Sequence, residues 1–278
     1  MEDREALLVR LKDKANFCRR ETIRLINIAK SGHYGSVFSA AEILATLYYH
    51  VLRYDPHDPA WSDRDRFILS KGHAAVGLYP LLADVGFFDP ALLDTYTRLG
   101  SPFGDHPDMR KVPGIDFSSG SLGHGLSVAV GMALAAHVTG RHYRVYALLG
   151  DGEMDEGQVW EAAMSASHFK LGNLVAIVDR NHVSVDGDTA DVMNIEPLSN
   201  KWDAFGWRVL QVDGHDLEAL LDCFAGLPHP ESVQPTVLIA NTVAGKGVSF
   251  MEDRFEWHLG YLAPPDQARA LADLEGEP

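Results

Sequence analysis

The stretch from Arg144 to Asn181 constrains the fold most strongly, because it contains two apolar, strand-like runs that are each followed by a polar side chain. Residues 144–149 (RVYALL) and 174–179 (LVAIVD) have the continuous apolar character of strands buried on both faces, and residues 158–170 between them have a helical pattern. In such a crossover unit the two strands are parallel, so their carboxyl ends share one edge of the sheet. Open α/β proteins bind their ligands at this edge.

Asp151 and Asn181 each follow one of these strand ends and offer two oxygen ligands to a hard cation such as Mg²⁺. A backbone carbonyl, water and diphosphate oxygens would complete the coordination shell. Gly150 and Gly152 let the backbone approach phosphates closely. The alternative is an ordinary strand-to-helix turn, since Asp-Gly is a common turn dipeptide. The asparagine after the next strand favours a metal-diphosphate site.

The rest of the chain predicts an α/β fold with a doubly wound, mainly parallel sheet and helices on both faces, because strands and helices alternate. Further strands are expected at 67–69, 207–212 and 236–241, and helices at 5–29 and 39–52. Residues 100–120, rich in Gly, Pro and Ser, resemble a long ordered loop. No repeat or low-complexity linker divides the sequence, so we expect residues 1–278 to form a single domain.

A formal charge of −15 disfavours binding to nucleic acid or to an anionic membrane surface. It does not disfavour a diphosphate, because a bound Mg²⁺ supplies the local positive charge. The sequence has no secretory-signal pattern and no apolar stretch long enough to span a bilayer. The two cysteines, Cys18 and Cys223, form no metal-binding or disulfide pattern, and we expect a cytoplasmic protein.

Five ordered motifs resemble the N-terminal half of transketolase over nearly the whole chain. Gly-Asp-Gly followed about 30 residues later by Asn is similar to the thiamine diphosphate signature of transketolases, pyruvate dehydrogenases and related decarboxylases. SGHYG, SKGHA, GSLGHGLSVAVGMALA and GKGVSFME match transketolase in order and spacing, at residues 31–35, 70–74, 120–135 and 245–252. The resemblance implies thiamine diphosphate as cofactor, with Mg²⁺, or Ca²⁺ or Mn²⁺ in its place.

The same resemblance implies a set of site residues. The metal ligands would be Asp151, Asn181 and the backbone carbonyl of Val183. The cofactor contacts would be His73, Gly120, Leu122, Gly150, Asp151, Gly152, Glu153 and Asn181. The loop that contains Gly120 leads into a helix starting near Leu126, whose positive dipole end can face a diphosphate. His124 stands where many transketolases carry Gln.

Four histidines would be catalytic, His33, His73, His106 and His258, in the motifs SGHYG, SKGHA, GDHPD and EWHLG. Imidazoles can hydrogen-bond sugar hydroxyls and relay protons near neutral pH. A metal cluster is the alternative role for them, but the chain has no H-E-x-x-H or other close ligand spacing. The motif around His258 departs from the family's Trp-His-Gly, because Leu259 intervenes.

Further positions are less specific. Glu156 and Glu161 match acidic positions at the family's dimer interface, although an exposed first helical turn would also favour acidic residues. Gly245 to Gly247 is not a P-loop, because Val248 occupies the Ser/Thr position. We expect an active-site loop there.

The resemblance also predicts the assembly. Transketolases need a pyrimidine-binding domain and a C-terminal domain, and this sequence has room for neither. We therefore expect the diphosphate-binding subunit of a two-component transketolase, which moves a two-carbon ketol unit from a ketose phosphate to an aldose acceptor. Its partner would be a C-terminal transketolase subunit carrying the pyrimidine-binding domain, in a heterotetramer that acts on sugar phosphates. The alternatives are a component of another thiamine diphosphate enzyme, such as a 2-oxo acid dehydrogenase or a ketol transferase to a carrier protein, and a non-catalytic interaction subunit.

Overall fold

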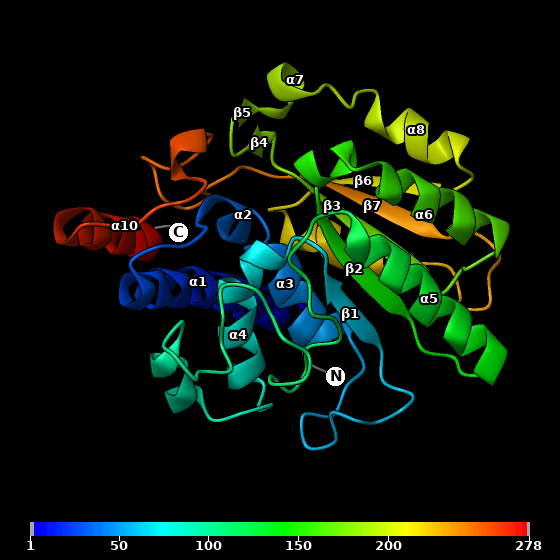
Figure 1. The fold of residues 1–278 in the computed structure, drawn as a ribbon, viewed down its shortest axis with the longest axis horizontal. Coiled ribbons are helices and arrows are strands. Elements are labelled where there is room, and N and C mark those ends of the chain that lie inside the picture. The colour runs from blue at the N-terminus through cyan, green and yellow to red at the C-terminus, as the bar shows by residue number, and fades with distance from the viewer. Residues whose placement is uncertain (1–2, 277–278) are drawn as a thin grey trace.

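Five parallel strands form the central sheet of the protein, which a computed structural model describes over residues 3–276. The order of the strands across the sheet is β1-β2-β3-β7-β6 (Figure 1). Their bounds are Arg66–Leu69 for β1, Val145–Gly150 for β2, Leu174–Arg180 for β3, Thr236–Asn241 for β7 and Arg208–Asp213 for β6. The predicted strands are confirmed to within one residue at each end.

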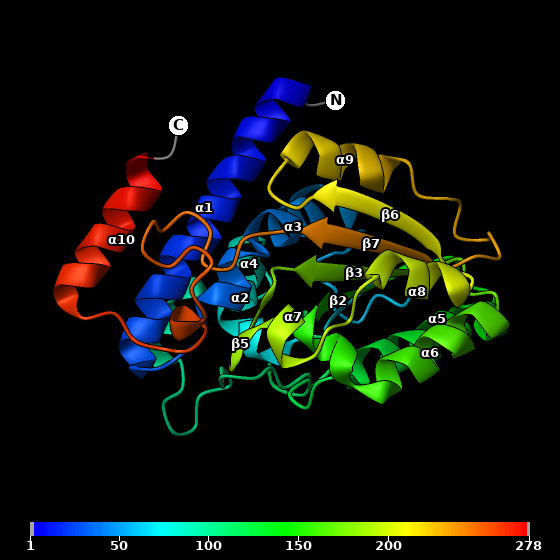
Figure 2. The same ribbon diagram turned by 90° about the horizontal axis from the view of Figure 1, so that it is seen from above.

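Alternate residues of each strand point into two separate apolar cores, which explains why the strand sequences are apolar throughout. Tyr146 and Leu148 of β2 belong to one core, whereas Ala147 and Leu149 belong to the other. The first core is covered by α1 (Arg4–Ala29), α3 (Ala41–Thr46), α4 (Ala75–Asp84) and α9 (Leu217–Ala225). The second is covered by α5 (His124–Thr139), α6 (Gly157–His168) and α8 (Leu198–Ala204), as Figure 2 shows. The doubly wound fold is confirmed.

The connections between strands determine which face each helix covers. The chain runs from β1 to β2, β3 and then β6 in one direction across the sheet, and the last helix before each of these next strands, α5, α6 or α8, lies on one face. The earlier helix of the β1–β2 connection, α4, covers the other face. From β6 it steps back to β7, and α9 in that connection lies on the other face. Crossovers of one hand require this change of face when the direction reverses. All five carboxyl strand ends lie at one edge, near α2 (Gly35–Phe38) (Figure 2).

Among the remaining elements, one differs from the sequence-based expectation, and others were not predicted. The helix expected at 39–52 is shorter and consists of α3 followed by a π-helical turn, η1 (Leu47–Val51). The segment after β3 contains a small hairpin, β4 (Val183–Ser184) with β5 (Gly187–Asp188), and then α7 (Thr189–Val192). The C-terminal segment forms a helix, α10 (Pro264–Gly276). Short 3-10 turns lie at η2 (Gly72–Ala74), η3 (Pro90–Thr95), η4 (Gly152–Asp155) and η5 (Phe255–Trp257).

Within residues 3–276, no helix combines the length and the apolar character that crossing a bilayer requires.

Candidate functional site

A cavity of about 290 Å³ opens at the carboxyl edge of the sheet, next to the ends of β2 and β3. Every residue that the sequence assigns to catalysis, cofactor or metal lines it. The walls come from segments far apart in the chain: the loop before α2, the η2 turn, the loop before α5, the two strand ends, the β4–β5 hairpin and the residue after η5. The lining residues are His33, Ser36, Lys71, His73, His106, Gly120, Leu122, Gly150, Asp151, Gly152, Glu153, Asn181, Val183, Ser184, Val185 and His258.

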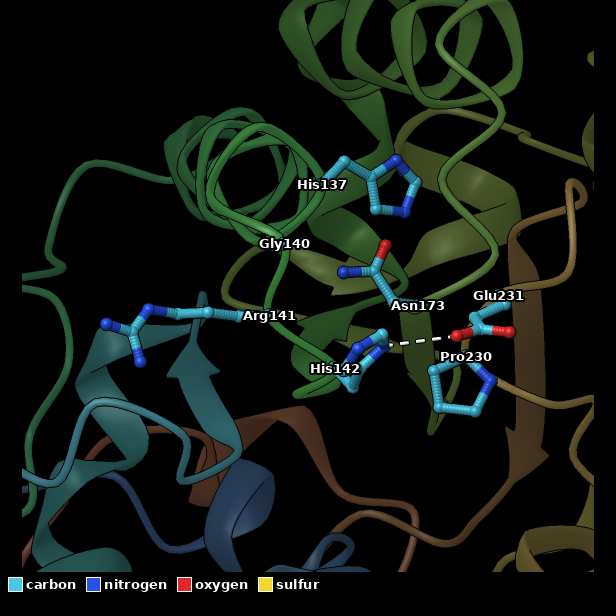
Figure 3. A pocket seen from close by; sticks show the side chains of 7 residues that line it. All are labelled: His137, Gly140, Arg141, His142, Asn173, Pro230 and Glu231. Atoms are coloured by element: carbon cyan, nitrogen blue, oxygen red, sulfur yellow. Dashed lines mark ion pairs between the residues drawn. The ribbon is translucent and has the colours of Figure 1, made fainter.

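A second cavity, of about 260 Å³, lies at the opposite edge, where residues preceding β2, β3 and β7 meet (Figure 3). Its His142 Nδ1 lies 3.2 Å from Glu231 Oε1, and both side chains are mostly exposed. Exposed pairs of this kind contribute little energy. Arg141 points away from the pair in Figure 3 and bonds Asp63 instead. Buried titratable groups line only the first cavity of the two, and we therefore place the candidate site there.

Asp151 is the buried carboxylate at the end of β2. Its Oδ2 accepts a hydrogen bond from the backbone N–H of His182 (2.7 Å), and its Oδ1 accepts one from Gly152 (2.9 Å). Burial, and then the nearby charge of Asp179, raise the pKa of Asp151 to about 7 although these hydrogen bonds oppose the shift. A cation beside the carboxylate would reverse this penalty.

Asn181 follows β3, and its carboxamide is held in one orientation. The side-chain nitrogen donates to Ser39 Oγ (3.1 Å) and Asp179 Oδ2 (3.3 Å), so the oxygen faces the other way, where it accepts the Val183 N–H (3.0 Å). A carbonyl oxygen has a second lone pair available for an ion. In residues 3–276 no group of three His, Cys, Asp or Glu side chains has metal-binding geometry. One carboxylate with amide and backbone oxygens is instead the donor set of a hard ion that keeps water and phosphate ligands.

A buried polar network lies directly beneath these two residues. Asp179 is fully buried, and it accepts hydrogen bonds from Lys71 Nζ, from Thr242 Oγ1 and from Ser39 Oγ (2.5 Å). Lys71 is 1% exposed and also donates to the backbone carbonyl of Ser36 (2.6 Å). A buried ion pair is tolerated only when its remaining polar atoms are hydrogen-bonded, as they are here. The network therefore fixes the orientation of Asn181 from below.

The glycines of the cavity leave room for a ligand. A Cβ added at Gly120, Gly150 or Gly152 would meet no other part of the protein closer than 3.6 Å, and all three positions line the cavity. A side chain at any of them would therefore occupy the cavity itself. This open, glycine-lined wall beside an oxygen donor set fits a diphosphate bridged to a divalent cation.

Glu153 is buried in the same wall, but its carboxylate is already engaged. Oε1 accepts from Ser70 Oγ and from the backbone N–H of Gly123 (2.8 Å), and Oε2 accepts from Gly150 (3.1 Å). Glu153 therefore joins the η2 turn, the α5 N-terminus and the end of β2. A direct contact to the cofactor stays a prediction for this residue.

Three histidines face one another on the opposite wall. The ring centroids of His33 and His73 are 4.8 Å apart, those of His33 and His258 are 5.6 Å apart, and those of His73 and His258 are 5.7 Å apart. Burial lowers the pKa of all three, and His33 lowers the pKa of the other two further. They are therefore neutral near pH 7, when each can accept one hydrogen bond and donate another. His106 lies at the rim and is more exposed.

Two expectations need correction. His124, the first residue of α5, is exposed and does not line the cavity, because the preceding loop turns at Gly123 (φ +81°) and presents Gly120 and Leu122 instead. The loop from Gly245 to Gly247 follows β7 as expected but does not line the cavity either. Its Gly245 N–H bonds the carbonyl of Gly35 (3.2 Å), which places the loop behind α2.

The sequence analysis did not assign a role to the residues that support the site, namely Lys71, Ser39, Asp179 and Thr242. Lys71 stands inside the motif SKGHA, and Asp179 ends a strand two residues before Asn181, so the signals were position in a motif and position at a strand end. Their pairing across the sheet is visible only in the folded chain.

The fold and the cavity together define a class: α/β proteins that bind a phosphorylated cofactor at the carboxyl ends of parallel strands. Within it, residues 11–272 match the family model for "Transketolase, thiamine diphosphate binding domain", and the chain belongs to this family.

Relatives of two sizes resemble the chain. It is 42% identical to a 6-deoxy-6-sulfo-D-fructose transketolase subunit of Clostridium sp., over 96% of this chain and 97% of that protein. It is also 42% identical to one of the subunits of the apulose-4-phosphate transketolase of Phocaeicola vulgatus, over 92% of this chain and 90% of that protein. The solved transketolase of Leishmania mexicana superposes with a TM-score of 0.89 and 31% identity, covering 95% of this chain but 41% of that one. The chain thus spans less than half of that transketolase and nearly all of the subunits.

Proposed function

We propose that the chain is the thiamine diphosphate- and Mg²⁺-binding subunit of a two-component transketolase, which transfers a two-carbon ketol unit from a ketose phosphate to an aldose acceptor. The observation that supports this most is that one cavity unites an oxygen donor set, Asp151 and Asn181, with a wall of three neutral histidines. The donor set suits a diphosphate bridged to a cation, and the histidines suit a polyhydroxylated substrate.

In this proposal, Asp151, Asn181 and the Val183 carbonyl hold the ion, and Gly120, Gly150 and Gly152 give the diphosphate room. Bound thiamine diphosphate supplies the nucleophilic carbon that cleaves the ketose and carries the two-carbon unit.

The histidines of this chain bind the sugar and move protons. His33, His73 and His258 are partly buried and neutral, so each can donate to a substrate oxygen through one ring nitrogen or accept a hydroxyl proton through the other. His106, at the rim, contacts the sugar as it enters.

The small number of cationic side chains around the cavity supports a partner subunit. Among the described residues that line it, Lys71 is the one lysine or arginine, and it is paired with Asp179. A substrate phosphate therefore needs a cationic site elsewhere, which we assign to a partner that also covers the aminopyrimidine ring of the cofactor. The subunit-sized relatives support this assignment. The free thiols of Cys18 and Cys223 agree with a cytoplasmic location.

The function is tested with purified chain and partner subunit, in an assay of two-carbon transfer from a ketose phosphate to an aldose. Turnover should require both subunits, thiamine diphosphate and a divalent cation, and a chelator should abolish it. If the pair binds thiamine diphosphate and the cation but instead oxidises 2-oxo acids or loads a carrier protein, the transketolase proposal is wrong and the alternative activity replaces it.

A further inference from the structure

Asp105 stands between two of the site histidines, although it does not line the cavity itself. Its Oδ2 lies 3.8 Å from His33 Nδ1 and 3.7 Å from His106 Nδ1. Its other oxygen accepts a hydrogen bond from the buried Tyr96 hydroxyl (3.3 Å). One carboxylate oxygen is thus directed at the same ring nitrogen of two imidazoles.

His33 needs a hydrogen-bond partner at one of its ring nitrogens, and Asp105 is close enough to provide it. His33 Nδ1 is buried and has no hydrogen-bond partner within 3.5 Å among the described residues. A buried ring nitrogen without a partner is costly, so one that faces a carboxylate just beyond this distance indicates a functional contact. A small rotation of Asp105, whose side chain is 38% exposed, would bring the two atoms together. Catalytic hydrogen bonds are commonly long before substrate binds and shorten in the complex.

We propose that Asp105 is a positioning residue that holds His33 and His106 as their Nδ1–H tautomers, so that Nε2 of each ring is presented to the substrate as an acceptor. The proposal depends on the proposed function in one respect: it takes a sugar as the substrate that the histidines bind. Asp105 itself touches neither substrate nor cofactor.

The chemistry follows from the two nitrogens of imidazole. A neutral histidine in water carries its proton mainly on Nε2, and a carboxylate beside Nδ1 reverses this preference because it accepts the Nδ1–H bond. One carboxylate has enough lone pairs to accept hydrogen bonds from both Nδ1–H groups, as the orienting carboxylate of a catalytic triad accepts one from its histidine. Two acceptor nitrogens directed at neighbouring sugar hydroxyls would then take up or share protons as the ketose is cleaved.

Several other charged and titratable groups surround His33, and among them His106 lowers its pKa. His73 and His258 face its ring, His106 lies nearby, and Lys71 lies behind His73. Burial lowers the pKa of His33, Asp105 partly opposes this shift, and His106 adds to it. On the far side of Asp105 the groups are Tyr79, Tyr96 and Asp108, and burial raises the pKa of both tyrosines. Among the described residues, Asp105 is the one carboxylate within 4 Å of a ring nitrogen of these site histidines.

The test reads the tautomers directly by ¹⁵N–¹H correlation spectra of the full chain labelled at histidine, with signals assigned by His33→Gln and His106→Gln. In the unaltered protein above pH 7, both residues should show the Nδ1–H pattern. In Asp105→Asn, His33 should shift to the Nε2–H pattern and its pKa should fall, whereas Asp105→Glu should retain the Nδ1–H pattern. Unchanged histidine spectra in Asp105→Asn would overturn the proposal. The measurement does not depend on enzymatic activity.

A second measurement uses the complex with the partner subunit. Asp105→Asn should lower kcat/KM by about 10- to 100-fold and alter its pH profile, with thiamine diphosphate affinity unchanged. Asp108→Asn is the matched control, because Asp108 lies on the same loop but pairs with Arg110 and Lys111 and should leave both spectra and rate unchanged. A normal rate in Asp105→Asn contradicts the positioning role. No ketol transfer by the unaltered pair contradicts the proposed function instead, and the tautomers still decide the role of Asp105.

Discussion

Asp151 combines burial with a charge that the folded chain alone does not neutralise. It is 2% exposed, and the nearest cation, Lys71, is committed to Asp179. Ionising a carboxyl in this environment is unfavourable, which is the physical meaning of its pKa of about 7. A divalent cation converts this unfavourable position into a binding site.

Asp151→Asn should therefore abolish Mg²⁺-dependent thiamine diphosphate binding without unfolding the protein. The loss of affinity should exceed the factor of about 10 to 100 that outer ligands of a metal contribute. The raised pKa means that ionised Asp151 lowers the free energy of unfolding as pH rises from about 4 to about 7, so the variant should be at least as stable as the parent at pH 8. Calorimetric titration and thermal unfolding separate the two effects. Asp155→Asn, an exposed acid on the same turn, is the control, and retained affinity in Asp151→Asn excludes the site.

His258 provides a test of the histidine wall by pH. Burial, then His33 and Lys71, lower the pKa of His258 from 6.5 to about 4. A base with a lowered pKa contributes stability that is fully present above pH 6.5 and is lost as pH falls from 6.5 toward 4. His258→Asn should remove this dependence, reducing the stability lost between pH 7 and pH 4.5 by about 2 to 3 kcal/mol, since one pKa unit corresponds to about 1.4 kcal/mol. Denaturant unfolding at the two pH values measures it. Equal losses in His258→Asn and in the exposed control His229→Asn would show that His258 is not buried as described.

At the scale of residues, the sequence predicts the site residues that stand in motifs, but not the residues that orient them. Asp151 and Asn181 follow strand ends, and that position is readable from apolar runs. Lys71 and Asp179 are 108 positions apart, and no local pattern indicates that they meet. Asp105 stands inside the motif GDHPD, but its proximity to His33, on another loop, is visible only in the folded chain.

At the scale of elements, the strands were the most predictable part of the fold, because burial on both faces requires runs of apolar residues without polar interruptions. The helix expected at 39–52 was wrong in length, since periodicity does not distinguish an α-helix from one that ends in a π-turn. A local contact satisfies one carbonyl of that turn, since the Tyr54 hydroxyl donates to the Tyr48 carbonyl (2.5 Å). The β4–β5 hairpin was missed because two-residue strands have no detectable alternation.

Four elements converge on the pair of Lys71 and Asp179. Lys71 belongs to the turn after β1, Ser36 to α2, Asp179 to β3, and Thr242 follows β7. The pair therefore joins the ends of β1, β3 and β7 to α2. It should matter for stability and for the metal site together.

Lys71→Met should lower the free energy of unfolding by about 3 to 5 kcal/mol, because it leaves Asp179 buried and unpaired. The double variant Lys71→Met with Asp179→Leu should lose less than the sum of the single variants, since it removes both charges. Mg²⁺ affinity should still fall by about 10-fold or more in the double variant, because Asn181 loses a hydrogen-bond partner that orients it. Chemical denaturation and calorimetry supply both numbers. Additive losses of stability would contradict the pairing.

At the scale of the molecule, the candidate site is open on one side. Its cavity of about 290 Å³ is at the lower limit of ligand pockets, which are about 300 to 1,000 Å³, and it must serve a cofactor and a sugar together. Exposed apolar side chains lie on the segments that form its rim: Val185 and Met193 on the hairpin and α7 side, Phe255 and Leu259 beside His258. Apolar side chains gathered around an incomplete pocket indicate a protein interface.

The isolated chain should therefore bind thiamine diphosphate weakly and transfer no ketol units, and a partner subunit that covers this rim should restore both. Activity in a titration should rise until the subunits are equimolar, and native mass spectrometry should detect a heterotetramer, because closed two-fold assemblies are the commonest. Met193→Asp should weaken assembly by placing a charge in the interface. Val233→Asp is the matched control, because Val233 is equally exposed but precedes β7 at the opposite edge of the sheet. Full turnover by the chain, after mass spectrometry has excluded a co-purified partner, would contradict this arrangement. Equal loss of assembly in the two variants would also contradict it, since only Met193 stands in the segment that follows the cavity-lining β4–β5 hairpin.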